Sequence, residues 1–321
     1  MIGCGRRAKD SKSRFQRYES GAGLIGPWRG SILGLKLASD GECAMLRFLF
    51  WNLGRRPLRQ LVADVARIHS IDILILAECD ISPAALLQAM NQGSSEYQLT
   101  RGLCESIRVV TKFHAGFLRP VYESKRISIR KLNLPGQQEL LLAMAHLPSG
   151  LYFGTESRSL ECVELAYAIR EEERRAGHRR TVLVGDLNLN PFDEGVVAAN
   201  GLNAVMTTRL AARGERTVQQ RSYPFFYNPM WGCFGDRMNR APGTYYYERA
   251  EHVNYYWNIF DQVLIRPGLL QIFHRDELRI LSSVGEVSLV DDNEQPDSSR
   301  SSDHLPITFS VSPLLETANV E

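Results

Sequence analysis

From Met45 onward, short apolar runs alternate with stretches in which apolar residues recur every three or four positions. The run MLRFLFWN at 45–52 predicts a buried strand, and Pro57 opens a stretch with one apolar helical face. That face is formed by Leu58, Leu61, Val62, Val65 and Ile68. The run DILILAE at 72–78 predicts a second buried strand, and 83–92 predicts a short helix. The alternation indicates an architecture that mixes helices and sheets.

The middle and the end of the body contain more strand-like than helical runs. Strands are expected at 97–100, 106–113, 126–134, 139–147 and from 182, then at 259–265, 277–284 and 305–311. The clearest helix spans 156–176, and its charged run at 171–175 predicts a solvated face. Its predicted inward residues are Leu160, Val163, Ala166, Tyr167 and Ile169. This pattern indicates sheets packed face to face under helical cover.

Residues 1–44 differ from this body because they are rich in Gly, Ser, Lys and Arg and show no sustained period. They carry eight basic and four acidic residues, whereas residues 45–321 carry 30 basic and 32 acidic ones. We expect 1–44 to be either a flexible arm or an upstream extension of the reading frame, with Met45 as the working start. The balance in the body excludes a highly basic nucleic-acid coat and suits an acidic, metal-binding pocket.

The composition is that of a soluble globular protein, with 44% hydrophobic residues in a chain of 321. No apolar run reaches the ~18 residues needed to cross a membrane. The nearest run, 31–38, is short and carries Lys36, which argues against a secretory signal. The six cysteines form no CxxC pair and no cluster with zinc spacing. We therefore expect reduced thiols and a cytoplasmic location.

Polar side chains stand where several predicted strands begin or end. They are Asn52, Glu78, His146, Asp186, Asn188, Asp261, Asp303 and His304. Each one alone suits a turn and is more often structural than functional. Together they supply hard oxygen ligands for a magnesium-like ion, a base, and neutral donors to a phosphate. The set therefore indicates a polar site at the mouth of a sheet.

Five short motifs follow one another along the body: WN at 51–52, LAE at 76–78, HL at 146–147, GDLN at 185–188 and SDH at 302–304. In this order they resemble the endonuclease/exonuclease/phosphatase superfamily, the fold of pancreatic-type deoxyribonucleases and abasic-site endonucleases. The resemblance implies an α/β (α+β) domain over residues 45–315, a four-layer sandwich of two packed mixed β-sheets flanked by helices. It also implies a hydrolase of phosphoester bonds that depends on Mg²⁺, with Mn²⁺ as an alternative.

The resemblance assigns the metal ion to Glu78, Asn52 and Asp303. A few oxygen ligands, completed by water and substrate, are the usual arrangement around Mg²⁺. Asn52 alternatively holds the phosphate or only closes its strand end. The sequence departs from the familiar nucleases at Gln262, where many members have Tyr or His after the late aspartate. It also departs from the inositol phosphatases of the superfamily at 189–191, so the sequence favours that activity less.

The catalytic roles are also implied by the resemblance. Asp261 would orient His304, as a carboxylate orients the histidine of other hydrolases. The base that activates water is either His304 or Asp186. Asn188 would donate to the charge that develops on the phosphorane. His146 is either an acid for the leaving oxygen or a buried structural residue.

The segment 221–257 holds twelve aromatic residues with several arginines among them. Aromatic faces stack on bases and guanidinium groups reach phosphates, so the segment predicts one wall of a nucleic-acid cleft, with Tyr246 as a contact. Alternatively it is a long loop that packs its aromatic rings on the sandwich. Arg55 and Arg56, just after Asn52, would flank the same cleft or would be solvated residues before a helix.

We therefore expect a nuclease that acts on DNA or RNA. Two alternatives stay open: a phospholipid or small-molecule phosphodiesterase or phosphatase, and a non-catalytic relative that binds a partner. The near-neutral charge of the body argues against tight binding of a duplex.

Overall fold

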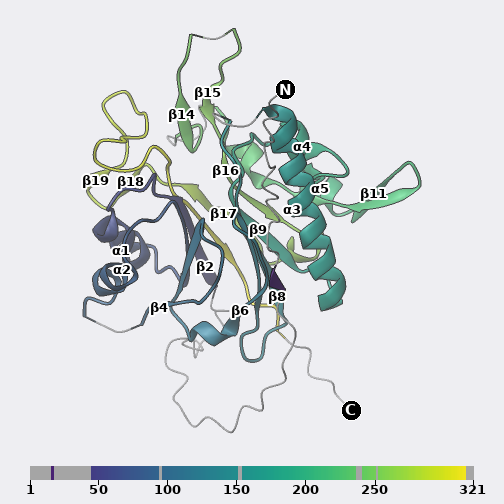
Figure 1. Cartoon of the computed structure of the whole chain (residues 1–321), viewed down its shortest axis with the longest axis horizontal. Coiled ribbons are helices and arrows are strands. Elements are labelled where there is room, and N and C mark those ends of the chain that lie inside the picture. The colour runs from purple at the N-terminus through teal and green to yellow at the C-terminus, as the bar shows by residue number, and fades with distance from the viewer. Residues whose placement is uncertain are drawn as a thin grey trace, which may run out of the picture.

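The computed structural model describes residues 16–17, 45–93, 96–150, 154–235, 241–250 and 252–315. Two large β-sheets pack together in the body, and helices lie on the outer side of each (Figure 1). The predicted four-layer α/β sandwich is thereby confirmed. Most of the expectation for residues 1–44 lies outside the described residues. The described part, β1 (Gln16–Arg17), pairs antiparallel with β6 (Leu118–Glu123).

One sheet has six strands and mixes parallel with antiparallel pairs. In order across the sheet they are β17 (Phe273–Ile280), β20 (Ile307–Val311), β2 (Leu46–Asn52), β3 (Ile73–Ala77), β5 (Ile107–Thr111) and β4 (Gln98–Leu99). Strands β2 and β3 run parallel and end at one edge, where the antiparallel β20 begins. Helices α1 (Arg59–Ile68) and α2 (Pro83–Met90) lie outside this sheet.

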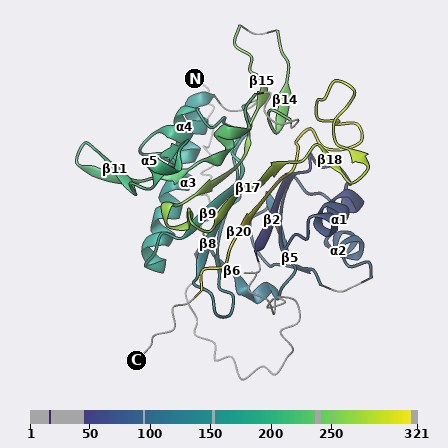
Figure 2. The same ribbon diagram turned by 180° about the vertical axis from the view of Figure 1, so that it is seen from behind.

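The other sheet has eight strands. In order they are β1, β6 (Leu118–Glu123), β7 (Ile127–Leu132), β8 (Leu140–His146), β9 (Thr181–Asp186), β16 (Asp261–Ile265), β13 (Phe226–Tyr227) and β10 (Ala204–Val205). Strands β8 and β9 run parallel, and β16 runs antiparallel to β9. The long helix α3 (Thr155–Ala176) covers the outer side, with the short α4 (Glu194–Val197) and α5 (Thr208–Ala211) beside it (Figure 2).

Three two-stranded hairpins project from the sandwich. They are β11 (Glu215–Val218) with β12 (Arg221–Pro224), β14 (Tyr245–Tyr247) with β15 (Tyr256–Asn258), and β18 (Ser283–Val284) with β19 (Val287–Ser288). The β14–β15 hairpin rises beyond the sheets at the top of Figure 1, while β11–β12 projects to the side. Of these two, the β14–β15 hairpin therefore stands at the end of the sandwich where β9 finishes, and β11–β12 does not.

Strand β8 shows why the predicted strands read as continuous apolar runs. Its side chains alternate between the two sides of the sheet. Leu142 and Met144 belong to the core that includes the six-stranded sheet, whereas Leu141 and Ala143 belong to the core beneath α3. Because both sides of the sheet are covered, the strand has no polar face.

The inward face of α3 differs from the predicted one. Leu160 and Tyr167 are mostly exposed, at 65% and 59%, and the buried positions are instead Cys162, Leu165 and, as predicted, Ala166 and Ile169. Positions three or four residues apart share a helical face, so the buried stripe lies to one side of the predicted stripe. The charged run 171–175 is not wholly solvated either, because two of its glutamates, at 172 and 173, are buried.

Two strand predictions also need correction. The strand expected at 277–284 begins earlier, as β17, and ends at Ile280, before the separate short strand β18. Strand β6, of which only residues 122 and 123 pair with β1, was not expected at all. It contains Pro120, and its pairing with β7 shifts register between Pro120 and Tyr122. A proline and a bulge interrupt the alternation on which the prediction relies, and both are tolerated at a sheet edge.

Candidate active site

The polar residues expected at strand ends meet at one edge of the sandwich. The parallel pairing of β2 with β3 places Asn52 and Glu78 at this edge of the six-stranded sheet. In the eight-stranded sheet, His146 and Asp261 lie on either side of Asp186 in the strand register. The carboxyl ends of parallel strands, together with the start of an antiparallel one, therefore bring distant residues into a single cluster.

Asp186 links the two sheets at the centre of this cluster. Its Oδ2 accepts a hydrogen bond of 2.9 Å from Asn52 Nδ2, and its Oδ1 accepts one of 2.9 Å from the backbone N–H of Asn188. The carboxylate is buried, with 1% of its surface exposed. His304 Nε2 lies 3.9 Å from Oδ2, which is close enough for charge attraction and too long for a hydrogen bond.

Asp261 and His304 form a buried pair beside Asp186. The distance between His304 Nδ1 and Asp261 Oδ2 is 2.8 Å. Burial alone would lower the pKa of His304, but the neighbouring Asp261 carboxylate outweighs this, and the pKa of His304 rises to about 10. Burial raises the pKa of Asp261, and the imidazolium opposes that rise. The pair therefore rests with its proton on the imidazole.

Glu78 lies on the open side of the cluster. Its carboxylate is 3.4 Å from His146 Nε2 and 3.6 Å from Arg55 Nε, and the same His146 nitrogen is 3.7 Å from Asp186 Oδ2. The hydrogen bond with His146 is the main cause that lowers the pKa of Glu78. His146 thus stands between two carboxylates, and Glu78 stays ionised beside it.

The backbone is strained at several of these residues. Glu78, Asn188 and Arg55 have φ values of +45°, +50° and +61°, in the left-handed region that side chains other than glycine rarely adopt. The Asn188 amide Nδ2 donates to the Leu147 carbonyl at 2.9 Å, which helps to hold its turn in place. Such strain persists only where neighbouring contacts impose it, and it concentrates at functional sites.

Asp303 lies at the surface of the same edge. Ser302 Oγ donates to the Asn52 carbonyl at 2.7 Å and lies 3.3 Å from Asp303 Oδ1. Gly54 has a φ of +53°, and a Cβ placed on it would come within 2.8 Å of Asp303 Oδ1. Glycine at position 54 therefore lets the carboxylate of Asp303 lie against the turn that follows Asn52.

The donor atoms at this edge suit a hard divalent cation. Within the described part of the chain, Asp186, Asp261 and His304 are three potential ligands whose donor atoms lie within 4.8 Å of one another. Since Asp261 and His304 already bind each other, the oxygens that remain for an ion come mainly from carboxylates at the open side. Carboxylate and carboxamide oxygens are the donors that Mg²⁺ and Mn²⁺ prefer. The expected ligands Glu78, Asn52 and Asp303 provide such donors.

The sequence left two roles open for the aromatic segment 221–257, packing on the sandwich or forming a wall of the site, and its residues include examples of both. Phe225, Phe226 and Tyr227 are buried in the sandwich as ordinary packing residues. Tyr245, in contrast, lies against the site, with its ring centroid 4.7 Å from that of His304. Burial raises the pKa of Tyr245, and the negative charges of nearby site carboxylates, led by the residue at 303, raise it further.

Tyr246, the predicted substrate contact, points to the other face of β14. Its ring packs against Tyr256 and Trp257, at centroid distances of 6.3 and 5.4 Å, and its hydroxyl lies 3.1 Å from Glu248. The structure therefore brings together the expected residues from strand ends and Arg55, but it places Tyr245 rather than Tyr246 beside His304.

Four buried carboxamides behind the site were not expected. Asn190 Nδ2 donates to Asn258 Oδ1 at 2.9 Å, and Asn228 Nδ2 donates to Gln262 Oε1 at 2.8 Å. Gln262 also donates to backbone carbonyls at 189 and 259. These bonds tie the turn after Asp186 to the strand that carries the late aspartate. The signal was present, because 189–191 and 262 are the positions where the sequence departs from the family it resembles.

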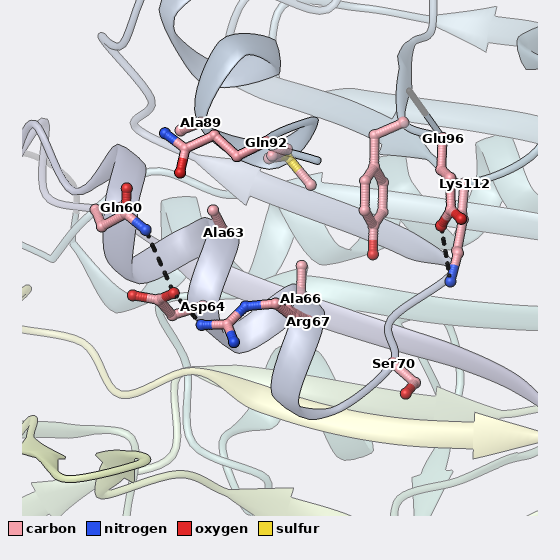
Figure 3. A pocket seen from close by; sticks show the side chains of 12 residues that line it. Gln60, Ala63, Asp64, Ala66, Arg67, Ser70, Ala89, Gln92, Glu96 and Lys112 are labelled. Atoms are coloured by element: carbon pink, nitrogen blue, oxygen red, sulfur yellow. Dashed lines mark hydrogen bonds and ion pairs between the residues drawn. The ribbon is translucent and has the colours of Figure 1, made fainter. Parts of the chain in front are cut away.

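A separate pocket is lined by residues of α1 and α2 and of the segments next to β4 and β5 (Figure 3). Its charged lining includes Asp64, Arg67, Glu96 and Lys112. Arg67 binds Asp64 at 2.6 Å and Lys112 binds Glu96 at 3.1 Å, so these charges form pairs within the pocket. None of the residues expected at strand ends lines it.

No protein-family model and no curated protein matches the sequence, but solved structures resemble the fold. The catalytic domain of human Nocturnin, with a bound sulfate anion, aligns with a TM-score of 0.51 and 14% identity, covering 84% of this chain and 94% of that domain. The 3′ phosphatase NExo from Neisseria aligns at 0.49 and 17% identity, covering 83% and 99%. An endonuclease/exonuclease/phosphatase family protein from Leptotrichia buccalis aligns at 0.47 and 13%, covering 83% and 99%. The match to the Nocturnin catalytic domain confirms the fold that the motifs predict.

Proposed function

We propose that this protein is a metal-dependent hydrolase of phosphoester bonds that acts through an activated water and takes a nucleic acid as substrate. The observation that carries the proposal is the hydrogen bond between Asp261 and His304, because it directs the other imidazole nitrogen toward Asp186 at the polar edge. At this edge, the oriented imidazole can contact a phosphate, the carboxylate of Asp186 can contact a water, and the carboxylates on the open side can bind a cation.

His304 and Asp186 divide the proton-transfer work. With a pKa of about 10, His304 is protonated at neutral pH. Its Nε2 therefore donates to a phosphate oxygen and stabilises the negative charge that develops there. Asp186 then becomes the base that takes a proton from the attacking water, which selects one of the two alternatives left by the sequence. Asn52 holds Asp186 in position through the 2.9 Å hydrogen bond.

A divalent ion, when bound, supplies Lewis-acid stabilisation of the phosphate oxygens. Glu78 and Asp303, with the carbonyl oxygen of the Asn52 side chain, would hold it. The described contacts use one hydrogen of the Asn188 amide, which leaves the second for a phosphate oxygen. His146, between Glu78 and Asp186, is placed to protonate the leaving oxygen or to keep the two carboxylates apart.

The substrate class rests on the chain's own residues. Tyr245 places an aromatic ring beside His304, and Arg55 places a guanidinium group beside Glu78. A ring and a cation at the reacting edge match a base and a phosphate of one polynucleotide.

Within the described residues no helix is long and apolar enough to cross a membrane. Among the described residues, Cys79, Cys104 and Cys162 form no disulfide, which supports the proposed cytoplasmic location.

Incubation with a substrate panel tests the proposed activity. Purified protein would be given single-stranded and duplex DNA, RNA, a phospholipid, and small phosphate mono- and diesters, with Mg²⁺, Mn²⁺ or a chelator. We expect cleavage of a polynucleotide that requires a divalent ion. Cleavage of only the lipid or small esters would replace the nucleic-acid assignment, and no cleavage of any substrate would favour a binding relative.

Glu78→Gln tests the metal-binding role, because it removes charge with little change of volume. Even groups that only support a metal ligand typically contribute 10–100-fold, so we expect Glu78→Gln to lower turnover by about 100-fold or more. Higher metal concentrations should partly restore it. Glu96→Gln, in the pocket of Figure 3, is the matched control and should retain full turnover. Full activity of the unmutated protein in excess chelator would contradict the proposal.

A further inference from the structure

A row of stacked groups leads away from His304 along one face of the β14–β15 hairpin. The Tyr245 ring contacts the His304 ring, and the Tyr247 ring lies 6.3 Å from that of Tyr245 with an angle of only 20° between their planes. The guanidinium carbon of Arg249 lies over the Tyr247 ring, 4.9 Å from its centroid. We call Tyr245, Tyr247 and Arg249 the stacking row.

The fold holds the inner end of the stacking row rigidly. The backbone of Tyr245 bridges to that of His304, and the N–H of Leu305 donates to the Thr244 carbonyl at 2.8 Å. The Tyr245 ring also packs against Phe260 at 5.3 Å. The outer end is more open, because Tyr247 is only half-buried and Arg249 is exposed. The row thus joins a fixed position at the site to an accessible one on the projecting hairpin (Figure 1).

The position over Tyr247 suits a nucleobase. A guanidinium group is planar and stacks on aromatic faces much as a base does. At an exposed site the attraction of a guanidinium group to the ring is weak, about 0.5–1 kcal/mol, whereas a base that stacks on an aromatic ring typically contributes roughly 1–3 kcal/mol. The long, charged side chain of Arg249 also places a cation near the position that a neighbouring phosphate would take.

We propose that the stacking row binds an unpaired nucleotide next to the bond that is cleaved, so that the site selects single-stranded nucleic acid or a single-stranded end over a continuous duplex. This inference rests on the proposed function. A base inside a duplex has both faces covered by its neighbours and cannot offer one to Tyr247, whereas a base in a single strand can. The formal net charge of the chain is only +2, so stacking has to provide affinity that a strongly basic surface would otherwise provide.

The adjacent tyrosine provides a matched comparison. Side chains alternate along a strand, and Tyr246 packs on the opposite face of β14, against Tyr256 and Trp257. Tyr246 is also the residue that the sequence alone favours as a contact. Parallel variants at 246 and 247 therefore decide which face of one hairpin meets the substrate.

Fluorescence anisotropy would measure the affinity of the full chain for a labelled 12-nucleotide single strand and for the matching blunt duplex, as DNA and as RNA, with chelator present to stop cleavage. We expect the unmutated protein to bind the single strand at least about tenfold more tightly than the duplex. Tyr247→Ala should weaken single-strand binding by about tenfold or more, and Tyr247→Phe should restore it because the ring remains. Tyr246→Ala should weaken it by less than Tyr247→Ala does.

Three results would overturn the inference: equal affinity for duplex and single strand, no loss in Tyr247→Ala, or a loss in Tyr246→Ala as large as that in Tyr247→Ala. Thermal unfolding checks that each variant is folded. If Tyr247→Ala unfolds, Tyr247→Leu keeps apolar volume without a ring and should show the same loss.

Turnover of an aryl phosphodiester by the unmutated protein with Mg²⁺ separates the two proposals. If the ester is cleaved, a negative binding result rejects only the stacking row, whereas failure on every substrate rejects the hydrolase itself.

Discussion

Strand β16 carries a buried acid–base pair at each end, and the two pairs are satisfied in different ways. At the polar edge, its first residue, Asp261, binds His304. At the opposite end, Arg266 directly follows the strand and binds Glu173 of α3. All four side chains are buried, with at most 7% of their surface exposed. The pairs therefore differ in chemistry and environment more than in burial.

The Arg266 pair uses nearly all of its hydrogen-bonding capacity. Arg266 Nε and Nη2 donate to the two oxygens of Glu173 at 2.7 and 3.2 Å, and Nη1 donates to two backbone carbonyls, at 224 and 225. The guanidinium carbon lies 3.8 Å from the centroid of the Phe226 ring. Thr181 Oγ1 adds a further bond of 2.7 Å to Glu173. Such saturation is what a buried charge needs in order to persist in the core.

The Asp261 pair is left incomplete. Asp261 Oδ1 is buried and accepts no hydrogen bond from the described part of the chain, and His304 Nε2 faces Asp186 across 3.9 Å. A buried polar atom without a partner costs stability. This cost falls on the pair at the polar edge, whereas the Arg266 pair avoids it. The contrast distinguishes a pair that supports the fold from the pair that we propose to act in catalysis.

The largest effect should come from breaking the pair at the edge. Asp261→Ala and His304→Ala should each lower turnover by on the order of 10²–10⁴-fold, because each removes the oriented imidazolium. If the two residues act as one unit, the double variant should lose little more than the worse single variant. Steady-state kinetics on the preferred substrate would show this, with circular dichroism to confirm folding. Fully additive losses would mean that the two residues act independently.

Breaking the core pair should instead affect the free energy of unfolding. Arg266→Met leaves the Glu173 carboxylate buried without its cationic partner and should cost about 3–5 kcal/mol. Chemical denaturation would measure this cost, while the turnover of the folded fraction should change far less than in the edge variants. Arg174→Ala is the control on the same helix, since Arg174 binds Glu171 on the exposed side of α3. An unchanged unfolding midpoint for Arg266→Met would contradict the assignment of a structural role.

The smallest effect should be a dependence of stability on pH that comes from the edge pair. The folded pKa of His304, about 10, lies above the ordinary value of 6.5. The stabilisation is therefore complete below about pH 6.5 and is lost as the pH rises toward 10. In chelator, the unfolding free energy of the unmutated protein should fall more steeply between pH 7 and 10 than that of His304→Gln. An equal pH dependence of the unfolding free energy in the two proteins would show that His304 does not carry the proton. Arg266→Met is the control and should keep the pH dependence of the unmutated protein.

Much of the edge could be predicted from the sequence, because strand ends are local features. An apolar run that stops at Asn52, Glu78 or Asp186 marks the end of a buried strand. Parallel strands of one sheet end at a common edge, so polar residues at such positions come together without detailed knowledge of the loops. The motifs added the order in which these residues occur, and the structure shows them together at one edge.

Two features depended on contacts between distant parts of the chain. The run EEERR at 171–175 reads as a solvated face, and Glu173 is buried only because Arg266, 93 residues later, meets it. Tyr245 and Tyr246 are chemically identical neighbours, so the prediction of Tyr246 as the contact had no difference between the two side chains to support it. The pairing of β14 with β15 and the bridge to His304 turn Tyr245 toward the site. Local patterns therefore determined which residues end the strands, whereas the tertiary structure decided which charges are buried and which face of the hairpin meets the site, because those depend on partners that no local pattern specifies.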